Sequence, residues 1–406
     1  MTSSSSHQLP AMYDGREQAF IKHSLLKTYL QKLVLIMGMS PSSRRAGKVE
    51  ICYVDCFAGP WEAPSDDLAG TSIAVSLQIL AACKQTLASW GVTATMRALF
   101  IEKSPASFAR LKTYLEQRAP KSVEAGCIQG DFLHHRQAIL DWCGSNAFGF
   151  FFIDPKGWKE IGVDELEPLL SRPRSEFLIN FMYMFVNWAA SMAEQQASMR
   201  TLLGAHVDLT GLTPDEREAV LLANYRAGLK ERVPVPRQPQ YVPRTAYARV
   251  LDVKKERVKY HLIYLTSHPK GVVEFMLASE KAEEIQRTVR DFVKGAARAE
   301  LTGMNDMFGD DPAAPVSQAR AAAADIDQFW LSYLAGGFRS VGLADFADIL
   351  EQTDWFPGEL QASLVSLIDR GLVANLDAAR PRPDKPLHYE KADRLQAISP
   401  KSVRSN

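Results

Sequence analysis

The sequence predicts an α/β protein with a doubly wound, largely parallel sheet, and three observations support this. Short apolar runs alternate with helical stretches through the first half of the chain. Most of these runs end in an acidic residue followed by a turn. The runs are apolar throughout, which is typical of parallel strands that helices cover on both faces. We therefore expect a Rossmann-like domain that binds its ligand at the carboxyl ends of the strands.

Length and composition limit the remaining possibilities. A chain of 406 residues is long enough for two or three domains, and 47 basic against 47 acidic residues give it no overall electrostatic preference. The sequence contains no run that could span a bilayer and no apolar signal core at its start, so we expect a cytoplasmic protein. Its five cysteines form no CxxC pair, which favours reduced thiols and no metal site.

The first strand, Ile51–Asp55, ends at the turn Ala58-Gly59-Pro60, where a glycine lets backbone N–H groups approach a ligand. Helical spacing of apolar residues then alternates with further apolar runs. Helices are expected over 16–37, 70–90, 107–117, 132–142 and 163–170, and strands over 98–102, 127–131, 148–154 and 176–181.

The second half of the chain is more varied. We expect a helical insertion over about 183–230, a strand over 259–266 and a helix over 271–298, and these complete a Rossmann domain spanning 15–300. The basic segment 40–47 and the proline-rich segment 232–247 are expected to be loops. Outside the domain we expect a disordered N-terminus over 1–14, a linker over 301–324 and a tail over 396–406.

Residues 325–395 have a different pattern. Three short helices, at 326–335, 343–352 and 357–370, precede a two-stranded wing, and this order predicts a winged-helix-like domain. The wing loop contains Arg380, Arg382 and Lys385, which modestly favours contact with nucleic acid. Many such domains bind proteins instead, so fold alone does not decide the partner.

Four acids end successive strands: Asp55, Glu102, Asp131 and Asp154. An acid after the second strand can bind ribose hydroxyls, and one after the third can reach an adenine amino group. No G-x-G-x-x-G or P-loop motif is present. S-adenosyl-L-methionine is therefore a better candidate ligand for the carboxyl edge of the sheet than NAD or a nucleoside triphosphate. Each acid alone could equally be a turn or cap residue.

The segment Asp154-Pro155-Lys156-Gly157-Trp158 follows the fourth strand. Its carboxylate and the Pro155 carbonyl can accept hydrogen bonds from an exocyclic amine, and Trp158 can stack on a base. The alternative is that Asp-Pro-x-Gly is an ordinary turn. Lys22 and His23, on the first helix, are on sequence alone more typical of a solvated helix edge.

Taken together, these residues resemble the three-Cys-motif partner (TcmP) proteins, which are similar to class I SAM-dependent methyltransferases. The order is also similar to that of bacterial 23S rRNA adenine-N6 methyltransferases. The matching segments are Lys22-His23, DCFAGP at 55–60, Gly70-Thr71-Ser72, Ile101-Glu102, Gly130-Asp131, FIDPKGW at 152–158, Asn180-Phe181 and YLTSHPKG at 264–271.

The resemblance implies SAM as cofactor, nucleic acid as substrate and a three-Cys-motif, radical-SAM-like protein as partner. It implies that Asp154 and Pro155 accept the amine, with Trp158 beside them. The residues then expected to bind the cofactor are Lys22, His23, Asp55, Phe57, Ala58, Gly59, Glu102, Lys103, Asp131 and Phe132.

The sequence departs from the family pattern at two places. It has Gly59-Pro60-Trp61 where the family has Gly-Pro-Gly, and Gly157 where the adenine methyltransferases have an aromatic. Our leading hypothesis is a SAM-dependent methyltransferase acting on nucleic acid, at adenine or another exocyclic amine. The alternative is an inactive methyltransferase-like scaffold, with Trp61 filling the cofactor turn, that binds nucleic acid or a partner protein through its winged-helix domain.

Overall fold

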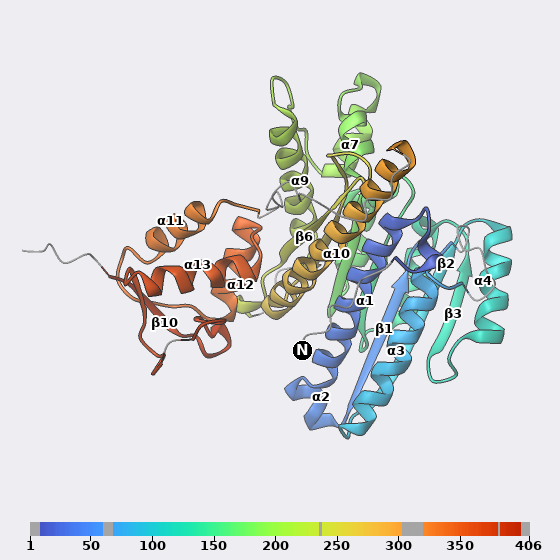
Figure 1. Ribbon diagram of the computed structural model, residues 1–406. Coiled ribbons are helices and arrows are strands. Elements are labelled where there is room, and N and C mark those ends of the chain that lie inside the picture. Colours follow the sequence, from blue (N-terminus) through green and yellow to red (C-terminus); the bar gives the residue numbers. More distant parts are fainter. Residues whose placement is uncertain (1–8, 60–67, 235–237, 303–319, 381, 399–406) are drawn as a thin grey trace, which may run out of the picture.

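A computed structural model describes residues 9–59, 68–234, 238–302, 320–380 and 382–398, and within them a seven-stranded sheet forms the centre of the protein (Figure 1). The strand order is β3-β2-β1-β4-β5-β7-β6. The strands are β1 (Lys48–Asp55), β2 (Thr93–Glu102), β3 (Glu124–Gln129), β4 (Phe148–Ile153), β5 (Ser175–Phe181), β6 (Arg244–Leu251) and β7 (Val258–Thr266).

The direction of the strands defines a switch point. Strands β1 to β5 are parallel, whereas β7 lies antiparallel to both β5 and β6. From β1 the chain proceeds outward to β3 and then returns to β4 on the other side of β1. Ligands of open α/β sheets bind beside the carboxyl ends of the strands at such a reversal. The predicted Rossmann-like, doubly wound fold is therefore confirmed.

Helices cover both faces of the sheet and bury two apolar cores. One core lies under α1, α3, α4 and α10, and the other lies under α5, α6 and the inserted helices α7 to α9. The helices are α1 (Glu17–Gly38), α2 (Pro41–Ala46), α3 (Ser72–Ser89), α4 (Pro105–Arg118), α5 (Arg136–Cys143), α6 (Val163–Leu170), α7 (Tyr183–Ala190), α8 (Gln196–Leu203), α9 (Pro214–Glu231) and α10 (Pro269–Thr302).

Three local predictions are wrong. The expected loop over 40–47 contains α2, which begins because Ser40 caps the Ser43 N–H and Pro41 occupies the first helical turn. The expected loop over 232–247 ends early, because β6 begins at Arg244. Residues 1–8 lie outside the described part, but the expected disorder to residue 14 is contradicted by a 3₁₀ turn at Ala11–Tyr13 that buries Tyr13.

The C-terminal region contains three helices and a small antiparallel sheet of order β8-β10-β9 among the described residues. The elements are α11 (Ala323–Tyr333), β8 (Arg339–Ser340), α12 (Leu343–Thr353), α13 (Pro357–Asp369), β9 (Val373–Asn375) and β10 (Arg394–Ala397). The predicted helices are confirmed, while the winged-helix assignment itself stays a prediction. Most of the expected linker, 303–319, lies outside the described residues.

The C-terminal region docks on the Rossmann domain through α12, which lies beside α10 and β6 (Figure 1). The Glu351 carboxylate accepts hydrogen bonds from the Thr245 N–H at 2.8 Å and from Lys230 Nζ at 2.9 Å. Arg226 donates to Asp354 at 2.9 Å. These contacts fix the position of the C-terminal region, because each joins a buried or half-buried group of the Rossmann domain to α12 or its C-terminal end.

Candidate functional site

Asp154, the first residue after β4, lies between two side chains from distant parts of the chain. Lys22 of α1 donates to Asp154 Oδ2, and Asn180 Nδ2, near the end of β5, donates to Asp154 Oδ1 at 2.7 Å. The Lys22 ammonium also lies 5.9 Å from the centre of the Tyr260 ring. The cation and the amide donor hold the carboxylate in one orientation, because each of its oxygens has its own partner.

Asn180 is a site residue for which the sequence analysis predicted no function. Its side chain is only 3% exposed, and Oδ1 has no hydrogen-bond partner among the described residues. A buried acceptor without a donor costs about 1–3 kcal/mol, so such an atom indicates a position where a ligand donates. Because Nδ2 of the same amide binds Asp154, this unpaired oxygen lies beside the carboxylate. The signal in the sequence was a polar asparagine within the otherwise apolar run FLINF at 177–181.

Asp55, at the end of β1, is completely buried. It accepts hydrogen bonds from Ser72 Oγ at 2.6 Å and from the Phe57 N–H at 3.2 Å, so it joins the turn after β1 to the start of α3. Burial raises the pKa of its carboxyl from 3.8 to about 7, and the two hydrogen bonds oppose that rise. Asp55 therefore stabilises the turn after β1 through buried hydrogen bonds to the turn and to the start of α3.

Glu102, at the end of β2, is 7% exposed and points away from solvent. Its Oε1 accepts the Ser104 N–H at 2.5 Å, while Oε2 accepts no hydrogen bond from any described residue. The neighbouring turn requires Gly130, whose φ is +148° and whose added Cβ would lie 2.1 Å from the His135 ring. The Gly130 N–H donates to the Glu102 carbonyl at 3.0 Å, which joins the ends of β2 and β3.

Asp131 is already engaged by protein groups. Its carboxylate accepts the exposed Lys103 Nζ at 2.8 Å and the Leu133 N–H at 3.0 Å. The hydrogen bond and charge of Lys103 hold the pKa of the Asp131 carboxyl below its usual value. Phe132 is buried, with its ring centre 5.3 Å from that of Phe57. An adenine amino group would therefore have to share or replace the Lys103 contact.

His23 lies on α1 next to Lys22 but is buried, with 7% of its surface exposed. Burial, followed by the nearby Lys22 and Arg16 charges, lowers the pKa of its imidazole well below 6.5, so the ring is neutral. The Tyr13 hydroxyl lies 3.3 Å from His23 Nδ1, and Arg16 donates to the Gly70 carbonyl at 3.2 Å. The start of α1 thus packs against the segment before α3, and the reading of Lys22-His23 as a solvated edge is wrong.

The stacking role expected of Trp158 is not supported. Its indole is 8% exposed and belongs to the core under α5 and α6, whereas Lys22 approaches Asp154 from the α1 side. A ring so covered offers no free face to a base. Pro155 is buried beside Asp154, and Ala58 is fully buried with its N–H donated to the Ile101 carbonyl at 2.8 Å.

The turn that would carry the cofactor is described only in part. Gly59 is half-buried and is the last described residue before the gap at 60–67. Trp61, on which the inactive-scaffold alternative depends, lies outside the described residues. Lys22, Asp55, Glu102, Asp131 and Asp154 do all lie at the carboxyl edge of the sheet or against it.

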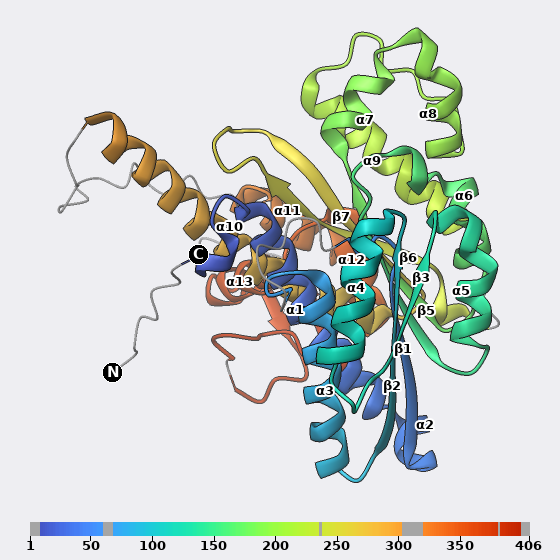
Figure 2. The same ribbon diagram turned by 90° about the vertical axis from the view of Figure 1, so that its right-hand side faces the viewer.

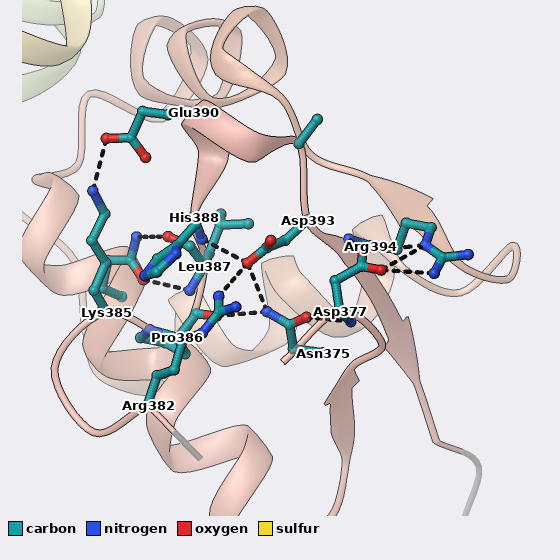
Figure 3. A network of polar contacts seen from close by, with 12 residues as sticks. Asn375, Asp377, Arg382, Lys385, Pro386, Leu387, His388, Glu390, Asp393 and Arg394 are labelled. Atoms are coloured by element: carbon teal, nitrogen blue, oxygen red, sulfur yellow. Dashed lines mark hydrogen bonds and ion pairs between the residues drawn. The ribbon is translucent and has the colours of Figure 1, made fainter. Parts of the chain in front are cut away.

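The segment between β9 and β10, which the sequence predicts to be the wing, contains a network of internal ion pairs (Figure 3). Arg382 donates to Asp393 at 2.5 Å, Lys385 to Glu390 at 2.9 Å and Arg394 to Asp377 at 2.7 Å (Figure 3). Asp393 also accepts the Asn375 amide at 3.0 Å and the His388 N–H at 2.9 Å. Arg382 and Lys385, two of the three cations expected to meet nucleic acid, therefore stabilise the wing itself.

Comparisons with known proteins yield likenesses of fold at low identity. No family model and no curated protein matches the chain. Among solved structures, protein LPL1258 from Legionella pneumophila is 12% identical over 65% of this chain and 90% of its own, with a TM-score of 0.35. An O-methyltransferase from Bacillus cereus, in complex with SAH, is 12% identical over 65% and 94%, with a TM-score of 0.32.

A third solved structure is the O-methyltransferase TomG from Streptomyces achromogenes, in complex with SAM. It is 13% identical over 65% of this chain and 93% of its own, with a TM-score of 0.30. The resemblance to the TcmP proteins and to the rRNA adenine methyltransferases stays a prediction. Separately, no helix among the described residues is both long and apolar enough to cross a membrane.

Proposed function

We propose that this chain is a SAM-dependent methyltransferase that acts on an exocyclic amine of a nucleic-acid base. The observation that carries the proposal is the Asp154 group at the switch point. A carboxylate fixed by Lys22 and Asn180 lies beside a buried, unpaired amide oxygen. Two acceptors side by side match the two N–H donors of a primary amine.

The chain's own residues would bind and orient the nucleophile. Asp154 and Asn180 Oδ1 would each accept one N–H, which would direct the nitrogen lone pair away from these two acceptors. When bound, SAM would supply an electrophilic methyl group, whose bond to sulfur would break as its bond to the amine nitrogen forms, with S-adenosylhomocysteine as the leaving group. Asp154 or water takes the amine proton. Positioning would supply most of the rate, and no covalent enzyme intermediate is needed.

The residues at the strand ends fit an adenosine-containing cofactor. Glu102 is a shielded carboxylate with an Oε2 that no described residue occupies, which suits a ribose hydroxyl. Asp131 ends β3 next to it, and Phe132 and Phe57 supply apolar surface. Neutral His23 and cationic Lys22 lie on the α1 side, where the methionine end would be held. No phosphate cradle is needed.

The same proposal includes a partner and a compartment. By resemblance, a three-Cys-motif, radical-SAM-like protein would act with this chain, and co-purification of the two tagged proteins would test that. The five cysteines are free thiols in the structure, which supports a reducing cytoplasm. The inactive-scaffold alternative depends on Trp61, which lies outside the described residues, and two of the wing cations through which it would bind nucleic acid, Arg382 and Lys385, are paired internally.

The test is methyl transfer from tritium-labelled SAM to total RNA and to genomic DNA. The wild-type chain should label one of them, and Asp154→Ala should not, while both bind S-adenosylhomocysteine equally. Asp141→Ala is the matched control, because that exposed helix carboxylate lies outside the site and should leave transfer unchanged. Label in neither nucleic acid, with or without the partner, would reject the substrate class; equal loss of transfer and cofactor binding in Asp154→Ala would reject the role of Asp154.

A further inference from the structure

The hairpin between β6 and β7 extends past the edge of the sheet that carries the candidate site. His261 of β7 pairs with Phe181 at the carboxyl end of β5, so the residues before His261 lie beyond that end. Figure 2 shows this hairpin (yellow) rising on the same side as the inserted helices α7 to α9 (green). Its base adjoins the site, because the Tyr260 ring lies 5.9 Å from the Lys22 ammonium.

The hairpin is held in a defined shape. The Asp252 carboxylate accepts the backbone N–H groups of Lys254 at 3.0 Å and Lys255 at 3.3 Å, and it pairs with Arg257 at 3.3 Å. Glu256 joins the loop to α10 by ion pairs to Arg290, at 2.6 Å, and to Lys294. The tip is therefore an ordered loop fixed to a long helix.

Positive charge exceeds negative charge on this hairpin. From Asp252 to Tyr260 the hairpin has two carboxylates, Asp252 and Glu256, against four cations, Lys254, Lys255, Arg257 and Lys259. The hydrogen bonds and charges of Arg290 and Lys294 lower the pKa of Glu256 to about 2, so Glu256 is ionised at neutral pH and counts as one of the two negative charges. Lys254 and Lys255 are exposed at the tip and pair with no acid of the described residues.

The wing, where the sequence placed nucleic-acid contact, differs in this respect. There three of the five cations, Arg382, Lys385 and Arg394, each have an acidic partner of their own, while Arg380 and Lys391 are exposed. The wing is nearly neutral, and it lies in the C-terminal region beyond α12 (Figure 1). The hairpin carries the larger surplus and adjoins Asp154 through Tyr260 and Lys22.

We propose that the β6–β7 hairpin, through Lys254 and Lys255, binds the phosphate backbone of the nucleic acid whose base enters the site. This inference rests on the proposed function and names where the substrate strand lies. From Arg257 to Tyr260 the strand advances roughly 10 Å, so the tip meets phosphates within a few nucleotides of the reacting base. Lysines act here as point charges, without base readout.

The experiment uses the full chain and a fluorescein-labelled, mixed-sequence single-stranded RNA, with the same sequence as DNA. Anisotropy titrations over a salt series give the affinity and its salt dependence. The double variant Lys254→Gln/Lys255→Gln should bind about tenfold more weakly, and the slope of log affinity against log salt should fall by roughly 1.4, or ~0.7 for each lost phosphate contact. Its affinity for S-adenosylhomocysteine should be unchanged.

The matched control is Arg380→Gln/Lys391→Gln, which removes two exposed cations from the wing and should change neither quantity. Loss of RNA binding in the wing variant but not the hairpin variant would overturn the inference and leave the proposed function intact. Binding of the wild type to anionic vesicles but to neither oligonucleotide would overturn both the hairpin's role and the substrate class. If the hairpin variant lost S-adenosylhomocysteine binding together with RNA binding, that would contradict a phosphate-binding surface separate from the cofactor site.

Discussion

Replacing Asp55 by asparagine should remove a large pH dependence from the stability of the fold. The carboxyl is completely buried, and its pKa rises from 3.8 to about 7 on folding. A group whose pKa rises on folding stabilises the protein fully below its unfolded pKa, and that contribution is lost as the pH rises through the folded value. The window is therefore from about pH 4 to about pH 7.

The magnitude follows from the size of that rise. A shift of about 3 pKa units at ~1.4 kcal/mol each corresponds to roughly 4 kcal/mol, a large part of the 5–15 kcal/mol that is typical of a domain's total stability. Asparagine is nearly isosteric. Its Oδ1 can still accept the Phe57 N–H, and its Nδ2 can donate to Ser72 Oγ. Asp55→Asn should therefore keep the fold without the ionisation cost.

The assay is urea unfolding of the wild type and of Asp55→Asn across this window. The difference in free energy of unfolding, variant minus wild type, should increase with pH by several kcal/mol and level off above about pH 7. Taking the difference cancels the other carboxyl groups, which both chains share. A flat difference would refute the burial argument, because it would mean that Asp55 titrates alike in both states.

Asp131→Asn is the control of opposite sign. Lys103 lowers the pKa of Asp131, so its contribution is present above the unfolded pKa and is lost as the pH falls through the folded value. The effect should be small and should weaken in salt, because Lys103 is exposed. If the variant-minus-wild-type difference in free energy of unfolding increased with pH for both variants, that would indicate a general change in the unfolded state.

Other predictions concern single groups. Asn180→Leu should lower the rate of methyl transfer by about 10- to 100-fold with S-adenosylhomocysteine affinity unchanged, measured by tritium transfer and calorimetry; an unchanged rate would remove Asn180 from the site. Glu351→Ala should lower the free energy of unfolding by ~1–3 kcal/mol in urea, because the Thr245 N–H loses its acceptor; no change would mean that the docking contacts are weak. Gly130→Ala should cost more than about 1 kcal/mol in the same assay, and adding His135→Ala should not restore stability, since the φ of +148° remains strained; full rescue would assign the cost to the ring contact.

The sheet could be predicted from sequence because burial on both faces leaves a direct mark. Runs such as FGFFFI at 148–153 are apolar at every position, and each of the first five expected strands overlaps a strand of the structure. The edge strand β6 was missed because the four prolines from Pro234 to Pro243 dominate the segment before it. The short helix α2 was missed although its Ser-Pro start is a capping signal. Its sequence, PSSRRA, consists mainly of serines and arginines and therefore shows no apolar helical periodicity.

The candidate site was less accessible to sequence reasoning, because its geometry joins distant residues. The sequence placed Asp154 and Lys22 in one family pattern, yet the direct contact between them depends on how α1 crosses the sheet. Nothing local could show that the Trp158 ring faces the core under α6, or that the wing cations meet Asp393 and Glu390. Such pairings are decided by tertiary packing.

The most direct test of the account is a calorimetric titration of the wild-type chain and of Glu102→Ala with S-adenosylhomocysteine. We expect saturable one-to-one binding to the wild type and a loss of affinity of about tenfold or more in Glu102→Ala, since one charged hydrogen-bond partner of the ribose is removed. No heat from the wild type at millimolar ligand, or equal affinity in the two chains, would contradict an adenosine site at the carboxyl edge of this sheet.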